Sequence, residues 1–182
     1  MARLHIIIDT REQTPWAFDP SAVDASIGTL QTGDYALAGD FSFGIERKSL
    51  DDFLGTVSSG WERFKRELDR MDAAKWVAKI IIVEGDYASC FFASAPDGEL
   101  VPPQHRHHRL TPQFVEKRVT ELTMRGVSVL FAGNPCIAAS LAVSIFRHRN
   151  NQIKTKSNNE HQTSKNRNSN DPQLQAGSHG RS

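Results

Sequence analysis

Three short apolar runs along the chain are typical of buried strands. The first spans residues 4–8 and is closed by Asp9, the second is the run KIIIVE at residues 79–84, and the third spans residues 127–132. Runs of this length that are rich in β-branched residues predict strands covered on both faces of a sheet. Asp9 is a candidate functional group because it stands at the carboxyl end of a predicted strand.

Two further β-like stretches predict a hairpin. They span residues 29–37 and 41–48, and residues 38–40 between them have the sequence AGD, which favours a turn. The second stretch ends in the sequence ERK. Pro15 and Pro20 lie before the hairpin and predict a loop there.

Helical signals follow the hairpin at four places. Ser49 and Asp52 resemble an N-terminal capping box, and apolar residues recur at helical spacing after Gly60. Two later helices are predicted at residues 111–126 and 134–146, each opening with an N-cap residue followed by proline. The alternation of strands and helices predicts an α/β domain with a mixed central sheet.

The end of the chain is polar. Between residues 150 and 182 the apolar residues are Ile153, Leu174 and Ala176, so no packed face is available. We therefore expect one domain over residues 1–149 and a disordered tail over residues 150–182.

Charge and cysteine content narrow the class of protein. The first sixty residues hold nine Asp or Glu against four Lys or Arg, which is unfavourable for a surface that meets phosphate by charge alone. A bound divalent cation would reverse that local sign. Cys90 and Cys136 are far apart and support neither a disulfide framework nor a four-ligand zinc site. No apolar run reaches signal-peptide or membrane length, so we expect a soluble intracellular protein of the cytoplasm, nucleoid or nucleus.

Candidate chemistry gathers at the end of the hairpin. Glu46 and Lys48 are two apart in a predicted strand, so their side chains leave the same face while Arg47 points to the other. A carboxylate can hold magnesium, and a nearby lysine can orient or deprotonate the attacking water. Asp34 could supply a second carboxylate and Asp9 a third.

Each of these residues also has a purely structural interpretation. Glu-Arg-Lys is a common solvated strand end and Gly-Asp a common turn, and Asp52 can stabilise a helix start without any metal. Their order favours a site: an acid that ends a strand, Gly-Asp on a hairpin, Glu-x-Lys on the returning strand, and then an amphipathic helix.

The ordered motifs resemble the nuclease domain of the XPF family, which belongs to the PD-(D/E)xK nuclease superfamily. They are DTRE at 9–12, GDY at 33–35, ERKS at 46–49, DF at 52–53 and IVEG at 82–85. The family signature consists of GD, a variable gap, ERK, three residues and D. This chain matches every position of it, and the likeness spans residues 4–149. The resemblance implies a restriction-endonuclease-like three-layer α/β domain with a central mixed β-sheet flanked by helices.

The resemblance also implies an activity, a metal and a set of site residues. The metal would be Mg²⁺, which Mn²⁺ can replace, and the protein would be a DNA endonuclease that cuts branched or flap DNA in repair, recombination or replication. The implied metal ligands are Asp9, Asp34 and Glu46, and the implied catalytic residues are Asp34, Glu46, Lys48, Arg47 and Asp52. Hydrolysis would proceed by in-line attack of water on the phosphodiester.

The resemblance places the start of the helix after Gly60 beside the active site, and the candidate DNA-binding residues are Arg11, Arg63 and Arg66. Basic residues interleaved with acids on a helix usually form a solvated face with intrahelical ion pairs, which is the alternative for the helix that carries Arg63 and Arg66. Trp61 and Phe64 on that helix are interpreted as core rather than as platforms for base stacking.

Partners other than DNA are indicated by the last helix. Nuclease domains of the XPF family commonly pair, so the resemblance implies a homodimer or heterodimer through the C-terminal helices. Packing of the apolar side on its own sheet is the alternative. The His-rich residues 105–109 lack cysteines and acids at metal spacing and are interpreted as a polar loop near phosphate.

Three functions are consistent with these patterns. The first is an active endonuclease, the second a nuclease-like DNA-binding subunit of a heterodimer that does not cut, and the third a small-molecule or RNA-processing enzyme on the same fold. The intact acids and Lys48 argue against the second, and only family analogy argues against the third. The polar tail shows no pattern for the helix-hairpin-helix modules that nuclease members of the family often carry, so the preferred DNA structure stays open.

Overall fold

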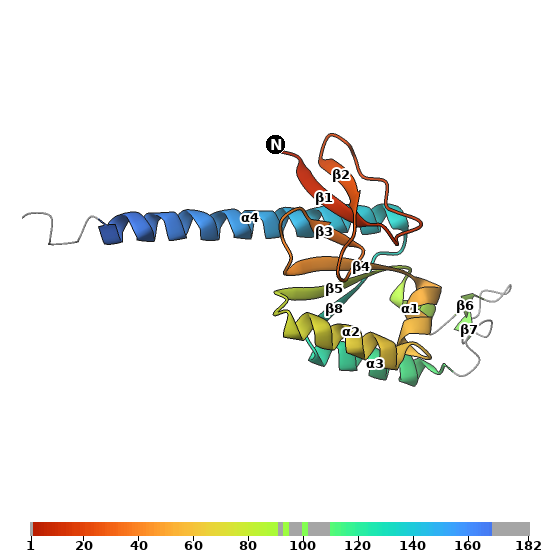
Figure 1. Cartoon of the computed structure of the whole chain (residues 1–182). Coiled ribbons are helices and arrows are strands. Elements are labelled where there is room, and N and C mark those ends of the chain that lie inside the picture. The colour runs from red at the N-terminus through yellow and green to blue at the C-terminus, as the bar shows by residue number, and fades with distance from the viewer. Residues whose placement is uncertain (1, 91–92, 95–99, 102–109, 169–182) are drawn as a thin grey trace, which may run out of the picture. The chain divides into compact units, whose positions relative to one another are not determined.

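A six-stranded mixed sheet lies at the centre of the computed structural model, which describes residues 2–90, 93–94, 100–101 and 110–168 (Figure 1). The strands are β1 (Leu4–Asp9), β2 (Val23–Gly28), β3 (Tyr35–Leu37), β4 (Phe43–Ser49), β5 (Ala78–Glu84) and β8 (Val127–Phe131), in the spatial order β2-β1-β3-β4-β5-β8. β3 runs antiparallel to β1 and β4, and the other neighbours are parallel. The predicted mixed sheet is therefore confirmed.

Helices cover both faces of the sheet. They are α1 (Leu50–Val57), α2 (Trp61–Ala73), α3 (Pro112–Met124) and α4 (Pro135–Asn168), and a short 3₁₀ turn, η1 (Tyr87–Cys90), and a small hairpin, β6 (Ala93–Ser94) with β7 (Leu100–Val101), follow β5. α1, α2 and α3 lie on one side of the sheet, and the first turns of α4 lie on the other (Figure 1). This arrangement is the three-layer α/β domain that the sequence predicted.

The core is divided by the sheet into two apolar clusters. Alternate residues of a strand point to opposite faces, so neighbours in sequence enter different clusters. Ile45 and Ile82 pack with Phe146 of α4, whereas Ile81 and Val83 pack with the helices on the other side. The two faces of β4 and β5 are therefore fixed by the buried residues, and with them the directions of the polar side chains at the strand ends.

Two strand predictions need correction. The predicted hairpin is present as β3 and β4, but β3 begins at Tyr35 rather than near residue 29. β2 was not predicted, and it is an edge strand in which only Val23 is buried while Ile27 is exposed. Its sequence, VDASIG, alternates apolar and polar residues over only a few positions and has no continuous apolar run, so the strand signal is short and weak.

The helix that begins at Pro135 is longer than predicted. Asn134 caps it by accepting a hydrogen bond from the backbone N–H of Ile137, as the sequence indicated. It ends at Asn168 rather than near Phe146, and the expected division between a folded domain over residues 1–149 and a disordered tail stays a prediction. No glycine or proline occurs between residues 136 and 168, and a helix that is already nucleated gains one hydrogen bond for each residue added.

Two compact units divide the chain, Met1–Phe146 and Arg147–Ser182. Within the first unit Phe146 is fully buried, Leu141 and Ile145 pack against the core, and Ile137 is 54% exposed. Most of the apolar side of the last helix is thus used within its own domain, and dimerisation through it stays a prediction. Within the described residues no helix combines the length and apolarity needed to cross a membrane. The His-rich residues 105–109 lie outside the described residues.

Candidate active site

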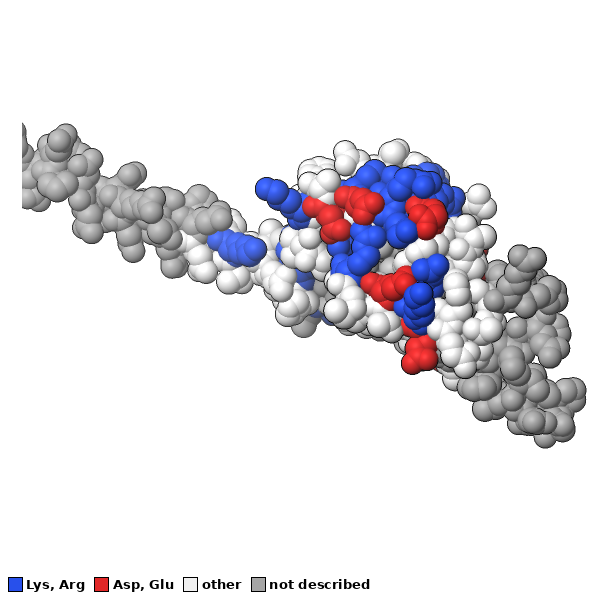
Figure 2. Space-filling view, turned by 90° about the horizontal axis from the view of Figure 1, so that it is seen from below, with Lys and Arg blue, Asp and Glu red and all other residues white. Residues whose placement is uncertain are grey.

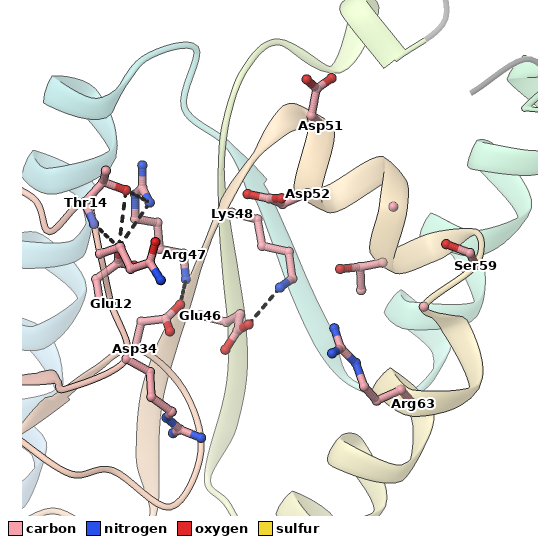
Figure 3. A pocket seen from close by; sticks show the side chains of 15 residues that line it. Glu12, Thr14, Asp34, Glu46, Arg47, Lys48, Asp51, Asp52, Ser59 and Arg63 are labelled. Atoms are coloured by element: carbon pink, nitrogen blue, oxygen red, sulfur yellow. Dashed lines mark hydrogen bonds and ion pairs between the residues drawn. The ribbon is translucent and has the colours of Figure 1, made fainter. Parts of the chain in front are cut away.

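The register of the hairpin brings Asp34 and Glu46 to the same face of the sheet. Tyr35 pairs with Ile45, and one position further on the N–H of Asp34 donates to the carbonyl of Ile45 at 2.9 Å. Asp34 therefore stands opposite Glu46. Its Oδ2 also accepts the backbone N–H of Arg47 at 2.7 Å, which fixes the carboxylate against β4. Figure 3 shows both acids directed into one pocket.

Gly33 shapes the entry of the chain into β3. Its φ is +77°, in the region that side-chain-bearing residues rarely adopt, and a Cβ there would stand 3.4 Å from the carbonyl oxygen of Ile45. The glycine of the Gly-Asp motif thus permits the backbone turn that places the side chain of Asp34 beside β4.

Lys48 completes the group on this face. Its Nζ donates to Oε1 of Glu46 at 2.8 Å, and both side chains are only about one-seventh exposed, 13% for Lys48 and 15% for Glu46. The ammonium group also lies 5.9 Å from the ring centroid of Phe64. Asp34, Glu46 and Lys48 are therefore brought together, as their spacing predicted.

The two acids are held in an environment that disfavours their charge. Burial raises the pKa of Asp34 to about 7, with a further contribution from the negative charge of Glu46. Burial also raises the pKa of Glu46, against the opposing effect of Lys48. A cation placed between the two carboxylates would relieve both effects.

Asp34→Asn is expected to stabilise the metal-free protein at alkaline pH. The pKa of Asp34 is higher in the folded protein than in the unfolded chain, so the native state binds the proton more tightly. The folded protein therefore loses stability as the pH rises from the unfolded pKa, near 4, to the folded pKa. Asparagine keeps an acceptor for the N–H of Arg47 and removes the charge. We expect a gain of about 1–3 kcal/mol in the free energy of unfolding near pH 8 and a much smaller gain near pH 4.5.

Urea unfolding in the presence of a chelator measures this difference. Asp24→Asn, which changes an exposed acid on β2, is the matched control and should leave the pH dependence unchanged. An Asp34→Asn protein that is no more stable than wild type near pH 8 would contradict the assigned electrostatics.

Arg47 points to the opposite face and joins three segments. Its Nε and Nη2 donate to Glu84 at 2.7 and 2.6 Å, and its Nη1 donates to the hydroxyl of Thr14 at 2.7 Å and lies 3.4 Å from Oε1 of Glu12. Glu84 also accepts the indole N–H of Trp16 at 2.6 Å. Arg47 thus ties the loop after β1 to β4 and β5, and its expected supporting role is that of a positioning residue.

Asp9 does not join the other two acids. It is 1% exposed, and hydrogen bonds from Arg11 and from the N–H of Leu30 occupy both carboxylate oxygens at 2.6 to 3.2 Å. Burial alone would raise the pKa of Asp9, but these hydrogen bonds outweigh it and hold the pKa below its usual value. In the structure Asp9 thus anchors Arg11, and its expected role as a third metal ligand stays a prediction.

Arg11 and Asp52 lie at the pocket with partners of their own. Arg11 is 66% exposed at the side chain, but its Nε and Nη2 donate to Asp9 and to the carbonyl of Leu30. The carboxylate of Asp52 accepts the hydroxyl hydrogen of Ser49 at 2.7 Å, and the N–H of Asp52 donates back to that hydroxyl. The helix-capping interpretation of Asp52 is thus realised, and its catalytic role stays a prediction.

These side chains open into a pocket of about 750 Å³. The lining residues that the sequence singled out are Asp34, Glu46, Arg47, Lys48, Asp52, Arg11 and Arg63, and the others include Glu12, Gln13, Thr14 and Ser59. Arg66 lies outside the pocket lining. For Glu12 the sequence signal was the motif DTRE at residues 9–12. For Glu84, which binds Arg47 without lining the pocket, it was the motif IVEG at residues 82–85.

The donors fit a magnesium-type cation. Among the described residues no three of His, Cys, Asp and Glu are grouped as a metal site, so the protein ligands would be the two carboxylates of Asp34 and Glu46. Mg²⁺ commonly binds one or two carboxylates and takes its remaining ligands from water and substrate phosphate. The cationic side chains of Lys48 and Arg63 lie around the same pocket (Figure 3).

Comparisons with known proteins identify a related domain and fold. A family model described as the ERCC4 domain matches residues 8–145. Two similar solved structures are XPF from Aeropyrum pernix, at 23% identity and a TM-score of 0.56, and the same protein in a complex with DNA, at 24% and 0.58. They cover 80% and 82% of this chain, which in turn spans 61% and 66% of theirs. No curated protein matches the chain.

Proposed function

The chain belongs to the ERCC4 domain family, as its motifs predicted, and from this premise we propose that it is a metal-dependent DNA endonuclease. The observation that carries the proposal is the convergence of Asp34, Glu46 and Lys48 in one pocket that is buried at its base and open to solvent. Two carboxylates and an ammonium group around a space for phosphate are the groups that metal-assisted phosphodiester hydrolysis needs.

The metal would be held by Asp34 and Glu46. Mg²⁺ or Mn²⁺ bound there would neutralise charge on the phosphate oxygens and favour ionisation of a water molecule. The raised pKa of both acids supports this assignment, because a cation restores the charged forms that burial disfavours.

Lys48 would position the attacking water and the phosphate. In the reaction the water oxygen forms a bond to phosphorus, one phosphorus–oxygen ester bond breaks in line with it, and the departing oxygen takes up a proton. Nζ of Lys48 lies in the pocket lining, hydrogen-bonded to Glu46, and would donate to the water or to a phosphate oxygen that enters the pocket. Arg47 and Glu84 would act indirectly by holding the loop that carries Glu12 and Thr14.

The substrate class that we propose is branched or flap DNA, processed in repair, recombination or replication. The solved relative that carries DNA is XPF from Aeropyrum pernix, and our proposal extends DNA binding to this chain. The alternative is a nuclease-like subunit that binds DNA without cutting it, and the intact Asp34, Glu46 and Lys48 argue against it.

A panel of labelled DNA substrates tests the proposal. Single strands, duplex, 3′ and 5′ flaps, forks and four-way junctions are incubated with the protein in Mg²⁺, in Mn²⁺ and in a chelator. We expect cutting only in the presence of metal and faster on the branched substrates than on plain duplex. An Asp34→Asn protein prepared in the same way controls for contaminating nuclease. Binding without cutting in either metal would replace the endonuclease by the non-cutting subunit.

A further inference from the structure

Three arginines stand in line on the exposed face of α2. Arg63, Arg66 and Arg70 follow one another at spacings of three and four residues, so they share one stripe of the helix, and all three are exposed. The opposite side of α2 is buried in the core and consists of Trp61, Phe64, Leu68 and Met71. We call Arg63, Arg66 and Arg70 the α2 arginine stripe.

The acids of α2 do not neutralise this stripe. Glu62 pairs with Lys65, Glu67 with Thr32, and Asp69 with Arg125, whereas Asp72 pairs with Lys79 and Arg125. With the residues that the structure describes, Arg63, Arg66 and Arg70 form no ion pair, although Glu67 lies next to them on the helix. The intrahelical ion pairs expected for this face are therefore limited to Lys65, and the three guanidinium groups keep their donors for a ligand.

The stripe begins at the candidate active site. Arg63 lines the pocket and points toward Lys48 and Glu46 (Figure 3), and Arg66 and Arg70 follow about one and two turns further along α2. Figure 2 views the molecule from the side of α2 and α3 and shows Lys and Arg side chains gathered over one part of this face. The arginines form a path that starts where the phosphate to be cut would lie.

We propose that the α2 arginine stripe binds phosphates along one strand of a duplex DNA arm that leads into the pocket. This inference rests on the proposed function. From Arg63 to Arg70 the helix advances by about 10.5 Å, seven residues at 1.5 Å each. Phosphates on one strand of B-DNA advance by about 3.4 Å each along the axis, so the stripe matches about three steps. Guanidinium groups suit phosphate because they can donate two parallel hydrogen bonds.

A duplex fits this face better than a single strand does. Proteins that bind single strands combine positive charge with aromatic side chains on which the bases stack. The aromatic residues of α2, Trp61 and Phe64, are 5% and 4% exposed and face the core. The exposed side of the helix offers donors for a backbone and no platform for bases.

The salt dependence of DNA binding tests the stripe without relying on cleavage. Arg66→Gln and Arg70→Gln are compared with Lys65→Gln, which removes one charge from the same helix but lies off the stripe and pairs with Glu62. Binding of the full chain to a labelled duplex arm is measured by fluorescence anisotropy over a range of salt, in a chelator that prevents metal-dependent cutting. Each stripe variant should bind more weakly and reduce the magnitude of the slope of log K against log salt by about one, since each phosphate contact on B-DNA contributes about 0.9.

The outcomes separate the stripe from the proposed function. Slopes for Arg66→Gln and Arg70→Gln equal to that of Lys65→Gln would overturn the stripe. If the stripe variants bound a single strand of the same length more weakly but bound the duplex as the wild-type chain does, the assignment to a duplex would be overturned. Cleavage by the wild-type chain in Mg²⁺ or Mn²⁺ is scored separately, so a chain that does not cut refutes the endonuclease while the slopes still decide the stripe.

Discussion

Glu46→Gln is expected to lower the rate of DNA cleavage by about 10³-fold or more. Glutamine keeps the shape of the side chain and an oxygen that can accept the hydrogen bond from Lys48, but it lacks the charge that a divalent cation requires. A catalytic metal supplies several kcal/mol of transition-state stabilisation, and a loss of about 4 kcal/mol corresponds to about 10³ in rate at 1.36 kcal/mol per tenfold change. The fold should persist, because burial already disfavours the ionised form of Glu46.

Two measurements on the same preparations decide this prediction. Cleavage is followed under single-turnover conditions across a titration of Mg²⁺, and binding of Mn²⁺ in the absence of DNA is followed by calorimetry. Glu116→Gln changes an exposed acid on α3 outside the pocket lining and is the matched control. The metal assignment would be wrong if Glu46→Gln bound Mn²⁺ and cut DNA as Glu116→Gln does.

The strands and helices that could be predicted from the sequence are those whose signals are local. β5 is covered on both faces and reads as an unbroken apolar run, and the helices at Pro112 and Pro135 open with an N-cap residue followed by proline. β2 has no continuous apolar run. Its short alternating sequence, VDASIG, gives only a weak signal, and in the structure only Val23 of this edge strand is buried. The length of α4 was missed because low apolar content was interpreted as disorder, whereas residues 150–168 continue a helix that the core had already nucleated.

The residues of the candidate site likewise differ in whether local signals predict their positions. Glu46 and Lys48 could be assigned to one face because the period of a strand is two residues, and Asp34 followed from a hairpin whose register the turn limits. The role of Asp9 could not be derived in this way, because its partner N–H belongs to Leu30 in a loop that returns 21 residues later. Only the fold shows that both oxygens of this carboxylate accept hydrogen bonds from Arg11 and Leu30.

Long-range pairing also explains why the network around Arg47 was missed. Arg47 and Glu84 are 37 residues apart, and only the parallel register of β4 and β5 places them on the same face. The indole of Trp16 then joins Glu84 from the loop after β1. The three residues come from segments that no local period connects, so their contact follows from the sheet order and from nothing in their own spacing.

Lys48→Met is expected to keep DNA binding and to lower single-turnover cleavage by a factor on the order of 100 or more, the contribution of a positioned group that acts on the attacking water. Methionine retains much of the stem of a side chain that is only 13% exposed, so the fold should tolerate it. The change removes the ammonium group that donates to Glu46 at 2.8 Å and leaves both candidate metal ligands in place. Lys48→Arg should restore little activity, because the wider planar guanidinium cannot occupy the same point and does not readily release a proton.

Enzyme in excess over DNA removes product release from the measured rate, so the comparison reports on the chemical step. Lys117→Met on the exposed surface of α3 is the control for the substitution itself, and an Asp34→Asn preparation excludes contaminating nuclease. Measurement of Mn²⁺ binding separates a direct effect from an indirect one, because loss of a neighbouring positive charge should leave the affinity of the two carboxylates for a cation unchanged or higher. A Lys48→Met protein that binds Mn²⁺ normally and cuts at the wild-type rate would remove Lys48 from the mechanism. Asp34 and Glu46 would then have to activate the water through the cation alone.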